Sequence, residues 1–206
     1  RGIENVSPGN NSQFIPFFFA RDVESLNKTA LGGPRFDTIT EQDLGLDAKF
    51  VFNDSMVLDI TLNPDFSQVE SDEPQVTVNE RFEVQFPERR PFFVENADFF
   101  ATDSILLFTR RIVDPEGGVR FTGRSGDYGF GTILINDEAP GLNRDANDSL
   151  NGEKASIGIL RGFRDISEQS RVGFFLSDRE FGDGYNRVAS VDARIKLNDN
   201  RITNIQ

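Results

Sequence analysis

The 206-residue chain contains no cysteine and no histidine. Without thiolate and imidazole ligands it cannot build the usual zinc or copper sites. It also cannot form a cysteine nucleophile or a serine–histidine triad. Any catalysis would therefore depend on carboxylates, Lys, Arg, Ser, Thr or Tyr. Any metal would be a hard cation held by oxygen atoms, such as calcium.

Tryptophan is absent, tyrosine occurs only 2 times, and no apolar run reaches the roughly 18 residues of a transmembrane helix. The lack of Trp and Tyr counts against the aromatic girdles of membrane barrels. The 34 acidic residues outnumber the 22 basic ones, and the net charge of −12 argues against nucleic acid as the main partner. Because the chain starts at Arg1 without Met and ends within an alternating run, we expect a fragment of a longer protein.

Alternation of apolar and polar residues is the main pattern that is present, and it predicts β-strands. Residues 82–86 form one such run, and longer polar loops are expected at 136–153 and 178–187. The remaining runs predict four hairpins: 46–52 with 58–62, 119–124 with 128–135, 155–164 with 171–177, and 188–197 with the residues after a turn at 198–200.

Short and long connections alternate along the second half, which is typical of transmembrane barrels. The polar face of these strands carries Asp59, Arg120, Arg124, Arg194 and Lys196, which suits a water-filled interior. The predicted fold is therefore all-β, an antiparallel meander that is part of an outer-membrane-type β-barrel. Residues 1–206 would be a single β-rich region of that barrel. A soluble sandwich or soluble barrel shows the same alternation and stays the alternative.

Residues 63–98 combine proline, phenylalanine and charge in a way that neither a strand nor a helix requires. Four prolines, at 64, 74, 87 and 91, each remove a backbone donor. Charged residues that are buried with the phenylalanines must be paired, because an unpaired buried ion is costly. We therefore predict a packed plug or brace that lies against the inner wall or across one mouth of the barrel.

No catalytic residue, cofactor or metal ligand is predicted, but one set of charged residues is a candidate ligand site or structural ion-pair cluster. Paired arginines can bind carboxylate or phosphate through two parallel hydrogen bonds. In so acidic a chain, internal ion pairs are the simpler interpretation. The set is Asp65, Glu70, Asp72, Glu88, Arg89, Arg90, Glu95, Arg110 and Arg111.

The acidic residues could also support two further chemistries, glycoside hydrolysis and calcium binding. Glycoside hydrolysis needs only two carboxylates at a suitable separation. Calcium could bind near residues 65–73 or in the loop 136–153, although neither matches the spacing of an EF-hand. The candidates for the carboxylate pair are Glu70, Asp72, Glu88, Glu95 and Asp98, and those for calcium include Asp65, Glu70, Asp72 and Glu73.

Several motifs occur together in a fixed order: Asn63-Pro-Asp-Phe-Ser-Gln-Val-Glu-Ser-Asp72, Asn79-Glu-Arg-Phe82, Phe86-Pro-Glu-Arg-Arg-Pro-Phe-Phe-Val-Glu95, Phe108-Thr-Arg-Arg-Ile112 and Val119-Arg-Phe-Thr-Gly-Arg124. This order resembles a family of large bacterial proteins of unknown function, often labelled membrane-associated or outer-membrane proteins. In that family such a region typically follows a carbohydrate-binding module similar to family nine. The resemblance covers roughly residues 46–124, and it supplies no established catalytic residue.

The resemblance implies a bacterial outer-membrane or cell-surface location. The leading hypothesis is a β-barrel region with a binding, transport or envelope-structural role, linked to a glycan-binding module. Its expected partners are outer-membrane lipid and a glycan or another envelope protein. The alternative is a soluble all-β domain that binds or hydrolyses glycans, with Glu88, Glu95 or Asp98 as acid and base.

Overall fold

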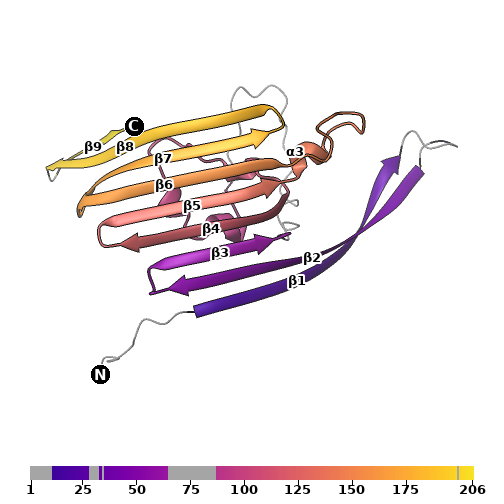
Figure 1. The fold of residues 1–206 in the computed structure, drawn as a ribbon, viewed down its shortest axis with the longest axis horizontal. Helices are drawn as coiled ribbons and strands as arrows, with labels where there is room; N and C mark the ends of the chain where they lie inside the picture. The colour runs from indigo at the N-terminus through magenta and orange to yellow at the C-terminus, as the bar shows by residue number, and fades with distance from the viewer. Residues whose placement is uncertain (1–10, 28–32, 34, 65–86, 199) are drawn as a thin grey trace.

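The computed structural model of the chain describes residues 11–27, 33, 35–64, 87–198 and 200–206. Nine strands of these residues form one open antiparallel sheet in sequence order (Figure 1). The strands are β1 (Asn11–Asn27), β2 (Arg35–Phe52), β3 (Met56–Leu62), β4 (Pro115–Ser125), β5 (Tyr128–Asp137), β6 (Ala155–Ser167), β7 (Ser170–Phe181), β8 (Gly184–Asn198) and β9 (Arg201–Ile205).

The predicted all-β antiparallel meander is thus confirmed, while the described strands do not close into a barrel. All four expected hairpins form, as β2–β3, β4–β5, β6–β7 and β8–β9. The β2–β3 turn places Asn53 and Asp54 at φ of 50° and 54°. Asn and Asp tolerate this left-handed conformation, which the tight turns of hairpins require.

The prediction of a long polar loop at 178–187 is wrong. Strand β7 continues to Phe181, β8 begins at Gly184, and these two residues pair directly. Gly182 has a φ of 55°, which lets the chain reverse in a two-residue turn. The polar residues around it lie on strand ends, where Arg187 forms ion pairs with Asp178 and Glu180.

The first hairpin was not predicted. Strand β1 pairs with β2 along its whole length, and residues 17–27 of β1 with residues 35–45 of β2 project beyond the end of β3 (Figure 1). The run Phe17-Phe18-Phe19 has no polar residue between its aromatics, so it interrupts the alternation that marks a strand. The strand expected at 82–86 lies outside the described residues.

The connections differ between the two ends of the sheet. The β2–β3, β4–β5, β6–β7 and β8–β9 turns are short and lie at one end (Figure 1). At the other end, residues 138–154 join β5 to β6 and contain α3 (Ala139–Leu142). Residues 63–114, which we name the β3–β4 connection, also start from that end and contain α2 (Pro91–Val94), η1 (Ala97–Phe100) and η2 (Thr109–Arg111).

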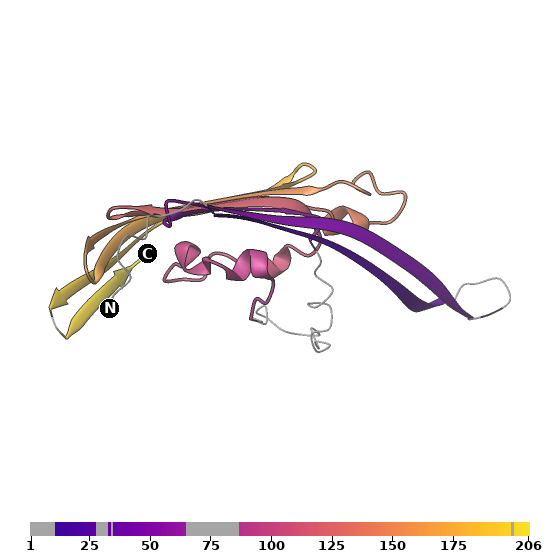
Figure 2. The same cartoon turned by 90° about the horizontal axis from the view of Figure 1, so that it is seen from below.

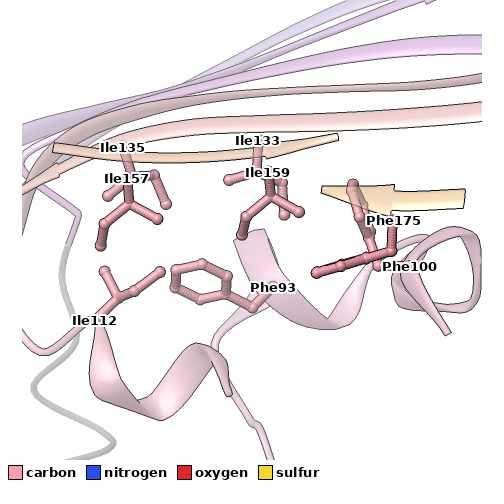
Figure 3. Packing of buried hydrophobic residues seen from close by; sticks show 8 residues of the cluster. All are labelled: Phe93, Phe100, Ile112, Ile133, Ile135, Ile157, Ile159 and Phe175. Atoms are coloured by element: carbon pink, nitrogen blue, oxygen red, sulfur yellow. The ribbon is translucent and has the colours of Figure 1, made fainter. Parts of the chain in front are cut away.

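The described helical part of the β3–β4 connection lies beneath the concave face of the curved sheet (Figure 2). Its buried side chains Phe93, Phe100 and Ile112 pack against a row of apolar residues on β5, β6 and β7 (Figure 3). Full burial of such a side chain is worth about 1.5–3 kcal/mol. The sheet residues of this cluster are Ile133, Ile135, Ile157, Ile159 and Phe175.

Gly131 of β5 allows the close approach of the connection. A Cβ atom at this position would lie 2.8 Å from the ring of Phe100, closer than real Cβ contacts. Among the described residues, no helix is long and apolar enough to cross a membrane.

Candidate functional site

A buried arginine joins the sheet to the β3–β4 connection. Arg120 of β4 is 1% exposed and lies opposite Asp59 of β3. Its Nη2 and Nε donate to Oδ2 of Asp59 at 2.6 and 3.1 Å. Its Nη1 donates to the backbone carbonyls of Phe92 and Glu95 in the connection. One guanidinium therefore holds two strands and one end of α2 together.

Lys49 of β2 and the side chain of Glu95 extend this network. Lys49 Nζ donates to Glu95 Oε2 and lies 3.7 Å from Asp59 Oδ1. Arg120 Nη2 lies 3.6 Å from the same Glu95 oxygen. Two cations and two carboxylates thus compensate one another, and the two buried members, Asp59 and Arg120, need such partners most.

A second cluster is centred on Glu88. Arg90 donates to Glu88 through Nε at 2.8 Å and Nη2 at 2.7 Å, and Thr109 Oγ1 donates at 2.6 Å. The backbone N–H groups of Arg89 and Arg90 donate to the same carboxylate at 3.1 Å. Arg90 is 3% exposed and lies 4.3 Å from the ring centre of Phe93. It also donates to the carbonyls of Thr109 and Ile112. This cluster ties residues 88–90, just before α2, to η2.

The environment of Glu88 keeps its carboxyl group ionised. Burial on its own would raise the pKa of Glu88. The hydrogen bonds from Arg90 and Thr109 and the charge of Arg90 outweigh this effect and lower the pKa from 4.5 to about 2. A general acid in glycoside hydrolysis needs the opposite, a pKa raised toward the working pH. The environment of Glu88 therefore suits a structural role for the ionised carboxylate.

We expect Glu88→Gln to lower stability at neutral pH and to have little effect in strong acid. The folded-state pKa lies below the ordinary value. The ionised carboxylate therefore contributes stability that is complete above about pH 4.5 and is lost as the pH falls toward 2. The shift corresponds to roughly 3 kcal/mol at most. The measurement is the free energy of unfolding of both proteins at pH 7, 4.5 and 2.5. A difference between them that stays constant with pH would contradict this assignment.

The structure places the sequence-predicted candidates in different environments. Glu88 and Arg90 lie together, Arg110 donates to the Pro87 carbonyl at 2.6 Å beside them, and Glu95 belongs to the Arg120 network. Arg89 and Arg111 are exposed on the connection. Asp65, Glu70, Asp72 and Glu73 lie outside the described residues. Within the described ranges, no group of three or more acidic residues could hold a metal ion.

The sequence did not identify Lys49 as a member of the ion-pair network. It indicated only that Asp59 and Arg120 lie on the water-facing side of their strands. Their position on the polar side of alternating strands was a usable signal. Which residues would pair was not predictable, because Asp59, Arg120 and Glu95 come from separate segments of the chain.

The opposite, convex face of the sheet is apolar, and no described segment covers it. The strand register puts uncharged residues at every convex position in the middle of β2 to β8. A hollow of about 460 Å³ lies over Gly158, between Leu134, Leu160 and Leu176. The large apolar side chains that remain exposed on this face include Phe14, Phe18, Leu44, Phe52, Leu62, Val119, Leu134, Leu160, Val172, Phe174, Leu176 and Val191.

Comparison with known proteins gives one family and no individual relative. Neither curated proteins nor solved structures match the chain. Residues 13–122 match a family described as a domain of unknown function (DUF5916). The expected resemblance to a family of unknown function is confirmed to this extent, whereas a carbohydrate-binding module and an outer-membrane location stay predictions. Because the match spans more than half of the sequence, the chain belongs to this domain family of unknown function.

Proposed function

We propose that this chain forms part of a bacterial outer-membrane β-barrel whose convex face contacts lipid and whose concave face lines the interior. The observation that carries this proposal is the opposite character of the two faces. Convex positions in the middle of β2 to β8 are uncharged. Charged strand residues such as Asp59, Arg120, Arg161 and Asp192 face the concave side, where ion pairs satisfy them. Membrane barrels have this apolar-out, polar-in arrangement.

The height of the apolar band supports a lipid contact. On β2 the convex positions from Leu44 to Phe52 are all apolar, and this stretch is about nine residues long. A strand tilted by about 45° needs roughly 9–11 residues to cross the hydrocarbon core, so the stretch is long enough to do so. Charged convex residues follow beyond the band, with Arg164 near the short turns and Asp178 and Arg187 near the opposite end.

So large an exposed apolar surface would be unusual for a soluble domain. Soluble monomers rarely expose a contiguous apolar patch larger than a few hundred Å². The open sheet also leaves β1 and β9 with unpaired backbone groups along one side. Edges of this kind invite pairing with another strand. Additional strands that close the sheet would satisfy both edges, because a closed barrel has no edge.

In this proposal the β3–β4 connection is a brace or plug inside the barrel. Its contacts with the concave face are an apolar cluster, the Arg120 network and hydrogen bonds to β9, where Ser104 and Asp103 contact Gln206 and Asn204. A barrel held in this way suits a binding, transport or envelope-structural role. A linked glycan-binding module would place a glycan or another envelope protein beside it.

Membrane fractionation of the full-length protein tests the proposal. We expect the protein in the outer-membrane fraction, resistant to washing at high salt and alkaline pH, and extracted only by detergent. A peripheral protein held by charge would be released by the salt wash. Recovery in the soluble fraction after mild lysis would disprove the lipid-facing role.

A further inference from the structure

A pair of arginines on the concave face contradicts the usual rules of strand pairing. Arg171 of β7 and Arg194 of β8 are directly opposite each other. Lys196 follows on the same face of β8, two residues further along. Like charges in directly opposite positions destabilise a sheet. Local conflicts of this kind concentrate at functional sites, and this one occurs in a chain with a net charge of −12.

The neighbouring carboxylates already have partners. Asp165 accepts from Arg171 Nε at 2.6 Å and lies 3.1 Å from Arg124 Nη1. Both guanidinium groups lie against the ring of Phe163, at 4.0 and 5.2 Å from its centre. One carboxylate thus serves two arginines, and the aromatic ring keeps them together.

The next acidic residue, Asp192, pairs with another arginine. Arg161 is 2% exposed and binds both carboxylate oxygens of Asp192, at 2.5 and 2.8 Å. Its Nε is buried and has no hydrogen-bond partner among the described residues. Among the described residues, Asp192 forms its ion pair with Arg161 and none with Arg194, although Asp192 and Arg194 lie on the same face of β8.

Arg194 keeps an uncompensated charge at an exposed position. Within the part of the chain that the structure describes, its side chain forms no ion pair and no hydrogen bond. Asp127 and Glu168, on the nearest short turns, form no ion pair with these arginines either. Asp103 of the connection instead accepts from Asn204, the β9 partner of Arg194.

We propose that Arg171, Arg194 and Lys196, with Arg124 beside them, bind a phosphate or carboxylate group on the concave face near the short-turn end. An oxyanion between Arg171 and Arg194 would turn their repulsion into attraction, because guanidinium groups bind such groups through parallel hydrogen bonds. The site goes beyond the proposed barrel function, and it does not depend on whether the convex face contacts lipid.

Binding of pyrophosphate and of tricarballylate to the full-length protein in detergent tests the site. Isothermal titration at constant ionic strength should show saturable binding of at least one of them, and the tighter one identifies phosphate or carboxylate as the preferred group. Arg194→Gln should weaken this binding by about tenfold or more, since it removes a charged hydrogen-bond donor from the site. Without a ligand, the same variant should melt at the same temperature as the wild type or higher, because the repulsion is removed.

Arg164→Gln is the matched control, because Arg164 is exposed on the convex face near the same short turns. It should leave the affinity unchanged. Lys196→Gln should weaken binding as well, which gives a second variant at the site. The proposal is overturned if neither anion binds the wild type, if Arg194→Gln binds as tightly as the wild type, or if Arg164→Gln weakens binding equally.

Discussion

Replacing Val191 by arginine should lower the free energy of unfolding in a lipid bilayer by about 2–4 kcal/mol. This is the cost of an arginine on the lipid face near the bilayer midplane. Val191 lies in the middle of the convex positions of β8 and is 74% exposed. The measurement is urea-induced unfolding of the full-length protein in phosphatidylcholine vesicles, followed by circular dichroism.

The effect of this substitution on stability distinguishes a lipid-facing position from a water-facing one, because Val191 has few protein contacts that the change could disturb. In a soluble protein, a change at so exposed a position would alter stability by no more than about 0.5 kcal/mol. Ser125→Arg is the control, since Ser125 is exposed at the β4–β5 turn, outside the apolar band. It should leave stability in vesicles nearly unchanged. Equal effects of both variants would refute a lipid-facing convex surface.

Arg120→Met should lower the free energy of unfolding by about 3–5 kcal/mol, the usual cost of removing one partner of a buried ion pair. The substitution leaves Asp59 buried without its main partner. It also removes the donor to the Phe92 and Glu95 carbonyls, so the connection loses its anchor to the sheet. Denaturant titration in detergent measures the first effect, and the rate of limited trypsin cleavage within residues 63–114 measures the second.

A double variant separates the two effects. Arg120→Met combined with Asp59→Leu removes both charges and should recover much of the lost stability, because the unpaired carboxylate is gone. Cleavage of the connection should stay fast, since its carbonyl groups still lack their donor. Arg187→Met is the control: its ion pairs with Asp178 and Glu180 are exposed, and exposed pairs contribute little to stability. Slow cleavage in the double variant would show that Arg120 does not anchor the connection.

The repeating pattern of the sequence was sufficient to predict the local structure. A strand places successive side chains on opposite faces, so alternation such as that from Met56 to Leu62 specifies a strand and its two faces without any distant contact. Turn residues such as Asn53 and Asp54 then determine where the chain reverses. The hairpin formed by β1 and β2 was not predicted, because apolar and polar residues do not alternate in its phenylalanine run.

The sequence indicated which types of residue form the site, but it did not indicate which residues pair with one another. The composition of residues 87–95 indicated that burial and charge occur together, and Arg90 and Glu88 are paired as this requires. The spacing did not reveal that Arg120 would reach Glu95, or that β7 and β8 would continue through 178–187 as a tight hairpin. The Arg120–Glu95 contact leaves no local trace, because it depends on how separate segments meet. The β7–β8 hairpin is local, and Gly182 with Asp183 was a turn signal that the polar residues around it obscured.

The sequence by itself determined the absence of thiol and imidazole chemistry, the strand character and the need to pair the charges of the β3–β4 connection. Only the tertiary structure decided which face of the sheet the connection covers and which face stays apolar and open. It also decided that Arg171 and Arg194 lie opposite each other. The physical reason is that periodicity assigns each residue to one side of its own strand, whereas register and long-range packing determine what that side contacts.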